Sequence, residues 1–262
     1  MLEVKNLTRI YDDGTVALRD VSFTVEEGEF LIIIGLSGSG KSTLLRCINR
    51  LIEPTEGQII WNGEDITAAD AEKLRRIRRK IGMVFQHFNL VRRSTVMTNV
   101  LSGRLGYVRQ WSSLFYQFPK KDRQKAIAAL ERLGIADQAH KRADELSGGQ
   151  QQRVGIARAL MQDPEMILAD EPVASLDPVL AHSILDRLEQ LNREDDMTIL
   201  CSLHYLDLIQ KYASRVIGLR EGRIVYRGSR EEIRAMTDDE FKEIYGEEAV
   251  RVSAATTPGG QG

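Results

Sequence analysis

Apolar residues in this chain recur with two different periods, and each period predicts a different kind of element. In residues 1–25 about every second position is apolar on both sides of a turn at 11–14, which predicts two half-buried antiparallel strands. Four continuous apolar runs each predict a strand that is buried on both faces: residues 30–34, 81–85, 165–169 and 197–202. Helical spacing separates the later runs, as in Leu180, Ile184, Leu188 and Leu191. This alternation predicts an α/β fold with a mainly parallel sheet covered by helices on both faces.

The middle of the chain follows the helical period alone. From about residue 95 to residue 160 strand patterns are missing, and apolar residues such as Ala126, Leu130 and Leu133 have helical spacing, so we expect a helical subdomain inserted into the sheet domain. Five aromatic residues lie between 107 and 118, where core packing explains them as well as a partner-facing patch does. A last helix is predicted to end near Tyr245. The small polar residues of 246–262 predict a disordered tail.

Charge gives little support for a nucleic-acid partner. The 262 residues contain 36 Lys and Arg against 38 Asp and Glu, a net charge of −2, so any polyanion must be bound locally. Residues 72–80 carry six cations around Leu74 and Ile77, but the run lacks interleaved aromatic residues. We therefore interpret it as the solvated face of an amphipathic helix.

Cysteine use and the N-terminus indicate a cytoplasmic protein. Cys47 and Cys201 fall within a helical and a strand pattern without metal-ligand spacing, and we expect both to be buried, reduced thiols. No basic segment followed by an apolar one begins the chain, and no apolar run approaches the ~18 residues that span a bilayer. Any attachment to a membrane would therefore depend on a partner.

The glycine-rich turn after the first buried run carries the strongest chemical signal. Gly35, Gly40, Lys41 and Ser42 have the spacing G-x-x-x-x-G-K-[ST], between a predicted strand and a predicted helix. In such a loop backbone N–H groups surround nucleotide phosphates, the lysine reaches the β- and γ-phosphates and the hydroxyl binds Mg²⁺. Glycine allows that close approach. The strand and helix on either side disfavour the alternative of an ordinary turn.

Two carboxylates, Asp170 and Glu171, end another buried run at the edge where open α/β sheets bind ligands, and Gln86 stands at the end of a third. Neighbouring residues on a strand point in opposite directions, so the two carboxylates are expected to have different tasks. We expect Asp170 to hold Mg²⁺, directly or through water, and Glu171 to polarise the attacking water.

A second anion site is predicted at the start of another helix. Ser147 has the position of an N-cap, and Gly148 and Gly149 leave the N–H groups of the first turn uncovered. This site could meet the phosphate loop within the chain or across a dimer, and the spacing leaves both arrangements open.

These motifs stand in the order seen in the nucleotide-binding subunits of ABC transporters, which the chain resembles over residues 1–245. The matching segments are 35–42, Gln86, 146–150, 168–172, 175–177 and His204. The resemblance implies an ABC-type ATPase domain over 1–245: a P-loop NTPase core with a mainly parallel sheet, an antiparallel β subdomain and an inserted helical subdomain. It implies ATP and Mg²⁺ as cofactors. It also implies a head-to-tail homodimer that encloses two ATP molecules, with Ser147–Gln150 facing the γ-phosphate on the other subunit.

Roles for single residues follow from the same resemblance. The implied nucleotide-binding set is Tyr11, Gly35, Ser37, Gly38, Ser39, Gly40, Lys41, Ser42, Thr43, Ser147, Gly148, Gly149, Gln150 and Asp177. In this set Tyr11 stacks on adenine and Asp177 crosses the dimer interface. The implied catalytic group is Glu171, with His204 sensing the γ-phosphate and Gln86 linking metal and water to the helical subdomain. The implied metal ligands are Ser42, Gln86 and Asp170.

Segments outside these motifs resemble, more closely, the ATPase subunits of phosphonate importers: 46–51, 53–55, 85–91, 103–107 and 203–207. That resemblance implies a transmembrane permease, an indirect periplasmic solute-binding protein, a peripheral location on the cytoplasmic face of the inner membrane, and no nucleic acid. Alternatives are an ABC ATPase of an amino-acid, phosphite or lipoprotein-release transporter, or a soluble ABC ATPase acting on nucleic acid or ribosomes. Against the last, the chain lacks a second phosphate loop, a long coiled coil and zinc-spaced cysteines.

Overall fold

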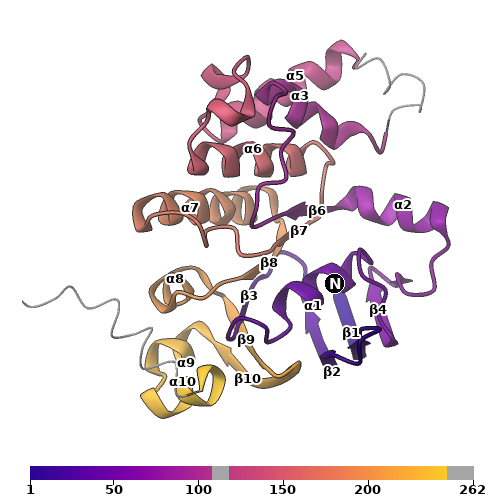
Figure 1. The fold of residues 1–262 in the computed structure, drawn as a ribbon, viewed down its shortest axis with the longest axis vertical. Coiled ribbons are helices and arrows are strands. Elements are labelled where there is room, and N and C mark those ends of the chain that lie inside the picture. The colour runs from indigo at the N-terminus through magenta and orange to yellow at the C-terminus, as the bar shows by residue number, and fades with distance from the viewer. Residues whose placement is uncertain (108–117, 247–262) are drawn as a thin grey trace, which may run out of the picture.

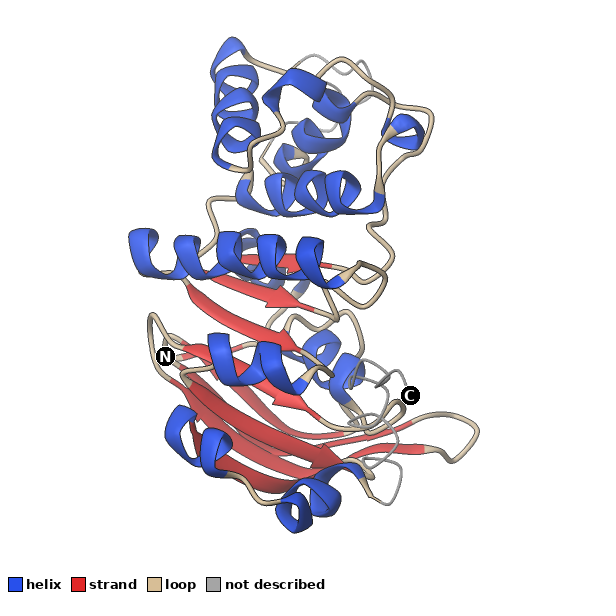
Figure 2. Ribbon diagram, turned by 90° about the vertical axis from the view of Figure 1, so that its left-hand side faces the viewer, coloured by secondary structure: helices blue, strands red, loops and turns tan. Residues whose placement is uncertain are grey.

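The computed structural model describes residues 1–107 and 118–246, whose strands form two sheets (Figures 1 and 2). The smaller sheet is antiparallel and has the order β2-β1-β4-β5. Its strands are β1 (Leu2–Ile10), β2 (Val16–Val25), β4 (Glu56–Trp61) and β5 (Glu64–Asp65). The first two are the antiparallel pair predicted from alternating apolar positions, and they meet at the predicted turn.

The larger sheet has the order β10-β9-β3-β8-β7-β6. Its strands are β3 (Phe30–Ile34), β6 (Ile81–Val84), β7 (Met166–Ala169), β8 (Thr198–Ser202), β9 (Arg215–Arg220) and β10 (Arg223–Ser229). All neighbours pair in parallel except β10 with β9. Each residue of β3, β6, β7 and β8 is buried, as their continuous apolar runs predict. The carboxyl ends of these four strands therefore lie at one edge.

Helices surround the sheets and also form a layer of their own (Figure 2). Those near the sheets are α1 (Lys41–Ile48), α2 (Ala71–Lys80), α7 (Pro178–Asp195), α8 (Leu206–Tyr212), α9 (Arg230–Ala235) and α10 (Asp238–Tyr245). The separate layer contains α3 (Val96–Leu101), η1 (Ser102–Arg104), α5 (Lys120–Arg132), η2 (Ala136–Gln138), η3 (Ala143–Glu145) and α6 (Gly148–Leu160). In the described part of 95–160 the structure has no strand beyond one isolated bridge, Thr95 with Arg142.

Two apolar cores lie on opposite faces of the large sheet. Ile32 and Ile34 of β3 belong to a core shared with the helical layer and α7, whereas Leu31 and Ile33 belong to a core shared with α1 and the antiparallel sheet. Both cores thus depend on the alternation of side chains along one central strand.

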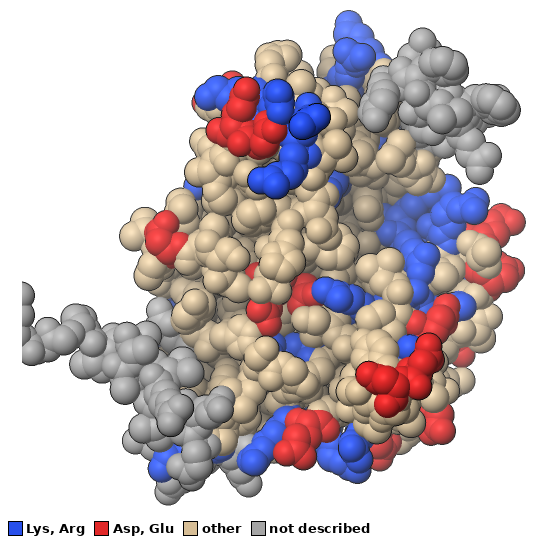
Figure 3. Space-filling model, in the orientation of Figure 1, with Lys and Arg blue, Asp and Glu red and all other residues tan. Residues whose placement is uncertain are grey.

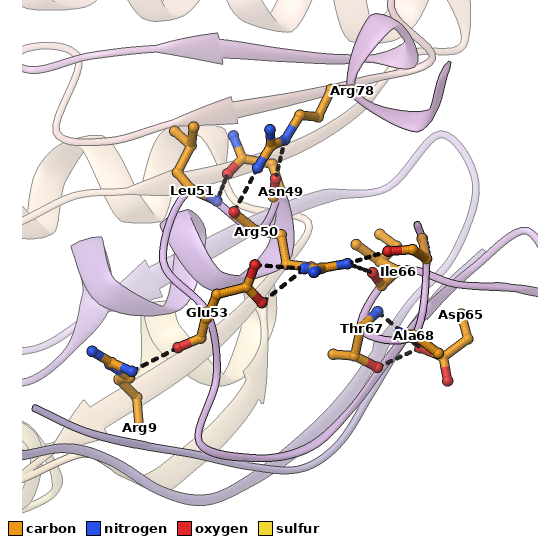
Figure 4. Close-up of polar contacts among 11 residues, drawn as sticks. Arg9, Asn49, Arg50, Leu51, Glu53, Asp65, Ile66, Thr67, Ala68 and Arg78 are labelled. Atoms are coloured by element: carbon orange, nitrogen blue, oxygen red, sulfur yellow. Dashed lines mark hydrogen bonds and ion pairs between the residues drawn. The ribbon is translucent and has the colours of Figure 1, made fainter. Parts of the chain in front are cut away.

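The helical spacing of Leu44, Leu45, Ile48 and Leu51 predicts that the helix after the phosphate loop continues to Leu51, but the observed helix α1 is shorter. Leu51 extends the helical pattern, but α1 ends at Ile48, Arg50 has a φ of 55°, and Leu51 is 51% exposed. Contacts from distant residues cause this ending (Figure 4): Arg78 donates to the carbonyl oxygens of Asn49 at 2.9 Å and Arg50 at 2.6 Å. These carbonyls at the helix end therefore need no further helical turn.

The Arg50 side chain fixes the same turn from the other side (Figure 4). It donates to the Glu53 carboxylate at 2.8 Å, the Ile66 carbonyl at 3.0 Å and the Ala69 carbonyl at 2.6 Å. The turn that carries Leu51 is thus held to the segment that precedes α2.

Other predictions have mixed outcomes. Both cysteines are buried and free, and burial raises the pKa of the Cys47 thiol to about 12. The guanidinium carbons of Arg79 and Arg104 lie 4.8 Å and 3.9 Å from the ring centroid of Tyr107, whereas Phe118 is buried in the core. The aromatic residues between them, and the predicted tail over 247–262, lie outside the described residues. Among the residues described, no helix combines the length and apolar character that a membrane crossing requires.

Candidate nucleotide site

The phosphate loop connects β3 to α1, and its glycines are required by both conformation and space. Gly35, Gly38 and Gly40 have φ values of 143°, 79° and 107°. A Cβ at Gly35 would lie 2.1 Å from the Leu219 carbonyl oxygen, and one at Gly40 would lie 2.5 Å from the Ala17 carbonyl oxygen. The turn can therefore close only with glycine at these two positions.

Two serines of the loop differ in their surroundings. Ser37 is exposed, whereas Ser39 is 5% exposed and its Oγ has no hydrogen-bond partner within the described residues. A buried hydroxyl without a partner is costly, and the phosphate oxygens of a nucleotide would supply acceptors for it. The buried, unpartnered hydroxyl of Ser39 therefore indicates that the loop can bind an anion.

Lys41, the first residue of α1, is 3% exposed and points back into the loop. Its Nζ donates to the carbonyl oxygens of Gly35 and Leu36, both at 2.9 Å, and lies 3.7 Å from Glu171 Oε1. Burial lowers the pKa of this amine, and the nearby carboxylates oppose that shift. The ammonium group is therefore held inside the loop, where it can reach the phosphates of a bound nucleotide.

Asp170 is the second buried charge of the site. It is 1% exposed, and it accepts hydrogen bonds from Ser42 Oγ at 2.7 Å, Arg46 Nη2 at 3.2 Å and Ser202 Oγ at 3.4 Å. The predicted metal pair Ser42 and Asp170 thus lies in direct contact. A hydroxyl and a carboxylate are the hard oxygen ligands that Mg²⁺ takes together with substrate phosphates.

Glu171 diverges from Asp170, as predicted, but strand alternation is not the reason. Strand β7 ends at Ala169, and Glu171 has a left-handed φ of 47°. Its N–H donates to Ser202 Oγ at 2.8 Å, which holds this conformation. The backbone turn therefore aims the two carboxylates at different partners.

The partner of the Glu171 carboxylate is His204, which follows the neighbouring strand β8. His204 Nε2 forms a hydrogen bond with Glu171 Oε1. This bond, together with the charges of His204 and Lys41, holds the pKa of Glu171 below its ordinary value, against the opposing effect of burial. Glu171 is thus an ionised carboxylate at the mouth of the phosphate loop, able to accept a hydrogen bond from water.

Tyr11 lies beside the start of α1. Its hydroxyl is 3.2 Å from Thr43 Oγ1, and the Arg9 guanidinium carbon lies 4.8 Å from its ring centroid. Because the arginine lies over one face of the ring, a flat ligand such as adenine would have to stack on the other face. Adenine stacking at Tyr11 nevertheless stays a prediction.

Gln86 lies two residues beyond β6, in a segment that begins next to Asp170. Val84 is paired with Ala169, and the Val84 carbonyl accepts a hydrogen bond from the Asp170 N–H at 2.9 Å. The Gln86 side chain is half-buried. Its role as metal ligand and link to the helical layer stays a prediction.

The predicted second anion site has the expected cap but does not lie at the phosphate loop. Ser147 Oγ accepts from the Gln150 N–H at 3.4 Å, and Gln150 Oε1 accepts from the Ser147 N–H at 3.0 Å, which forms a capping box at α6. No hydrogen bond within the described residues joins 147–150 to 35–43. Figure 1 shows α6 and α1 well apart. One chain therefore does not bring the two sites together.

Asp177 has a local structural function. Its carboxylate accepts from the Leu180 N–H at 3.0 Å and thereby caps α7. The first turns of α6 and α7 are neighbours, because a Cβ at Gly149 would lie 3.1 Å from Leu180 Cδ1. The exposed carboxylate of Asp177 thus lies near the capped start of α6.

Arg46 and Ser202 contact the carboxylate of Asp170 but were missed in the sequence. Arg46 follows Ser42 by one helical turn, and this spacing is a signal that could have placed it on the same face of α1. Ser202 ends β8, next to β7 in the sheet, so its position was recognisable only once the strand order was known.

The described residues contain no group of three or more His, Cys, Asp or Glu side chains arranged to hold a metal ion. A magnesium ion at Ser42 and Asp170 would therefore take its remaining ligands from groups of other kinds, such as the Gln86 amide oxygen, water and nucleotide phosphates.

Comparison with known proteins assigns the family. Residues 18–174 match the ABC transporter family model. The chain is 53% identical over 245 residues, 94% of each chain, to the phosphonates import ATP-binding protein PhnC of Staphylococcus aureus strain USA300. It is 49% identical over 246 residues, again 94% of each chain, to phosphonates import ATP-binding protein PhnC 3 of Halalkalibacterium halodurans.

Solved structures agree with this assignment. The dimeric ATP-binding cassette MJ0796, bound to ADP and Pi, is 36% identical with a TM-score of 0.78, over 87% of this chain and 98% of that one. The ADP conformation of the cassette MJ1267 is 32% identical with a TM-score of 0.81, over 97% and 98%. This chain therefore belongs to the ABC transporter family, among its ATP-binding proteins.

Proposed function

We propose that this chain binds MgATP in the phosphate loop and hydrolyses it with Glu171 as the group that orients and deprotonates water. One observation carries the proposal: at the carboxyl edge of the sheet, Ser42 contacts Asp170, while Lys41 and His204 both contact the neighbouring Glu171. In this scheme Lys41 binds the β- and γ-phosphates, and His204 contacts the γ-phosphate.

Mg²⁺ would be held by Ser42 and Asp170, with Gln86 completing the set from the neighbouring segment. The bound ion would neutralise charge on the β- and γ-phosphates. Arg46 and Ser202 hold the Asp170 carboxylate in place through their hydrogen bonds.

We further propose that two chains form a head-to-tail dimer around two ATP molecules. Support comes from the separation of the capped start of α6 from the phosphate loop in one chain, because a partner would supply it across the interface. Next to the Asp177 cap, Val179 is 78% exposed, so apolar surface is available there. The dimeric state of the related cassette supports the same arrangement.

For the transported solute, the similar PhnC proteins lead us to propose a phosphonate or a related phosphorus compound. The chain would then be one ATPase domain, with residues 95–160 as its helical part. It would sit on the cytoplasmic face of the membrane, bound to a permease that receives solute from an extracytoplasmic binding protein.

A groove between α2 and the helical layer is suited to contact such a permease. One part, of about 470 Å³, is lined by Arg75, Arg79 and Leu105, and a connected part of about 240 Å³ by Leu51 and Phe85. Among the residues that the structure describes, none that lines either part carries a carboxylate. Figure 3 shows Lys and Arg side chains gathered over α2. The groove therefore fits a partly apolar segment that carries acidic residues.

Growth on phosphorus sources tests the solute. A strain that lacks this gene and any second importer should fail to grow on a phosphonate as sole phosphorus source and should grow normally on phosphate. Restoration by the wild-type gene, and not by Glu171→Gln, would tie uptake to hydrolysis. Unimpaired growth of the deletion strain on every phosphonate tested would refute this solute class.

Co-purification tests the groove. Arg75→Glu should reduce the amount of permease recovered with the chain, while the isolated subunit keeps its ATP turnover. Arg193→Glu, an exposed charge reversal on α7, is the matched control and should leave recovery unchanged. Equal recovery with all three proteins would argue against this surface.

A further inference from the structure

The segment between β6 and α3 is held in an unusual conformation, and Gln86 lies near its start. Phe88 and Asn89 have φ values of 54° and 49°, in the left-handed region that residues other than glycine rarely adopt. Two successive residues in this region persist only where the surrounding structure holds them.

Arg158 of α6 provides that support. Its Nη1 donates to the Asn89 carbonyl oxygen at 2.5 Å and its Nη2 donates to the Phe88 carbonyl oxygen at 2.9 Å. A guanidinium group is planar, with donors in fixed directions, so it holds both carbonyls in one orientation. The turn of the segment is therefore defined by one side chain of the helical layer.

Phe88 also joins the segment to the start of the same helix. A Cβ at Gly148 would lie 3.7 Å from Phe88 Cζ, and a Cβ at Gly155 would lie 3.9 Å from the Phe88 carbonyl oxygen. One residue thus touches α6 at its first turn, where the predicted second anion site lies, and again two turns later.

The far end of the segment is fixed to α3. Asn99, which is 2% exposed, accepts from the Val91 N–H at 2.7 Å and donates to the Val91 carbonyl oxygen at 3.1 Å. Residues 88–91 are therefore held to the helical layer by hydrogen bonds, whereas the residues up to Val84 form strand β6 of the sheet. Gln86 lies at the junction of the two.

We propose that Arg158 and Phe88 are positioning residues that lock the segment carrying Gln86 to α6. The position of Gln86 in its own nucleotide site then depends on the position of Ser147–Gln150, which serves the nucleotide on the other subunit. This inference rests on the proposed function, because it gives Gln86 and Ser147–Gln150 the roles described there.

Arg158→Met tests whether Arg158 holds the segment to α6. Methionine fills the space of the aliphatic part of the arginine side chain but cannot donate hydrogen bonds to the carbonyl oxygens of Phe88 and Asn89. The variant should fold and bind ATP without Mg²⁺ as the wild type does. Its ATP turnover should fall by about 10- to 100-fold, with a higher Mg²⁺ concentration at half-saturation, as expected when support of a metal ligand is lost. Arg158→Lys should recover part of both.

Arg153→Met is the matched control. Arg153 lies on the same helix, but its Nη2 donates to Ser183 Oγ of α7 at 3.0 Å and not to the segment. It should keep the turnover and the Mg²⁺ response of the wild type. A wild-type Mg²⁺ response in Arg158→Met would overturn the inference.

A double-variant cycle decides whether Arg158 acts through Gln86. If it does, Arg158→Met combined with Gln86→Ala should be no slower than Gln86→Ala alone, because residues that act as a unit are not additive. Losses that multiply would overturn the inference. Should Arg158→Met fail to fold, Arg158→Lys and Phe88→Leu carry the same cycle. Absence of ATP turnover in the wild type would instead overturn the proposed function, so the two failures are distinguishable.

Discussion

At the scale of single residues, the site consists of buried charges that satisfy one another before any nucleotide binds. Asp170 is paired with Arg46 and Ser42, and Lys41 with two loop carbonyls, so neither charge is left without a partner. Burying either charge alone would be costly. The site is therefore preorganised, and bound phosphates and metal would exchange for contacts that already exist.

Lys41→Ala should lower ATP turnover by about 10²-fold or more. The loss follows from weaker phosphate binding, because Lys41 is the only lysine among residues 35–42 of the phosphate loop. Titration with a fluorescent ATP analogue and a phosphate-release assay would measure both effects. Lys121→Ala, an exposed lysine of α5, should behave as the wild type. Near-normal ATP affinity and turnover in Lys41→Ala would contradict the assignment of the loop.

Glu171 predicts a pH dependence of stability. The His204 hydrogen bond holds its pKa below the ordinary 4.5 in the folded, nucleotide-free protein. A depressed folded pKa stabilises the protein above the unfolded pKa, and this contribution is lost as the pH falls through the folded pKa. Between about pH 6 and about pH 3 the wild type should therefore lose more free energy of unfolding than Glu171→Gln. Urea denaturation at matched pH measures the difference, and equal losses would contradict the pairing.

At the scale of elements, the phosphate loop shows which glycines the fold requires. Gly35→Ala should lower the free energy of unfolding by about 3 kcal/mol, because its Cβ would overlap a backbone carbonyl and the φ is unfavourable. Gly38→Ala has open space around its Cβ and should cost only about 1 kcal/mol, for the φ alone. Urea denaturation of both variants makes the comparison, and equal costs would show that the close contact with Leu219 is unimportant.

The elements that local patterns could predict are those formed by local causes. Continuous apolar runs predicted β3, β6, β7 and β8, and motif spacing predicted the phosphate loop that joins β3 to α1. The predicted continuation of α1 to Leu51 was wrong. The helix ends at Ile48 because Arg78, 28 residues away from Arg50, donates a hydrogen bond to the Arg50 carbonyl oxygen. The same limit applies to the site: Ser202 and Arg158 act on residues 32 and 70 positions away, and no local spacing reports such contacts.

At the scale of the whole molecule, the phosphate loop and the capped start of α6, where a second anion site is predicted, do not meet within one chain. The alternatives left open by the sequence were closure within the chain or across a dimer, and α6 lies apart from the phosphate loop in Figure 1. An inserted helical layer that presents its capped helix outward is difficult to explain for a subunit that works alone. The arrangement therefore favours an active unit of two chains.

Glu171→Gln tests both the catalytic role and this two-chain arrangement. Glutamine keeps the size of the side chain but cannot accept a proton, so ATP and Mg²⁺ should still bind while turnover falls by ~10²–10⁴. Persistent ATP would then hold two subunits together. We expect the variant to shift from monomer towards dimer with ATP and not with ADP, as measured by light scattering.

Adding Ser147→Arg should reverse that shift, because arginine removes the cap of α6 and crowds the γ-phosphate bound by the other subunit. Ser229→Arg is the matched control, since Ser229 caps α9 in an equivalent capping box outside the proposed interface. It should leave the ATP-dependent dimer intact. A Glu171→Gln protein that stays monomeric at high ATP would count against the two-chain site, and wild-type turnover in that variant would count against Glu171 as the base. Loss of the dimer with Ser229→Arg as well would mean that the reversal reports helix stability and not phosphate contact at Ser147.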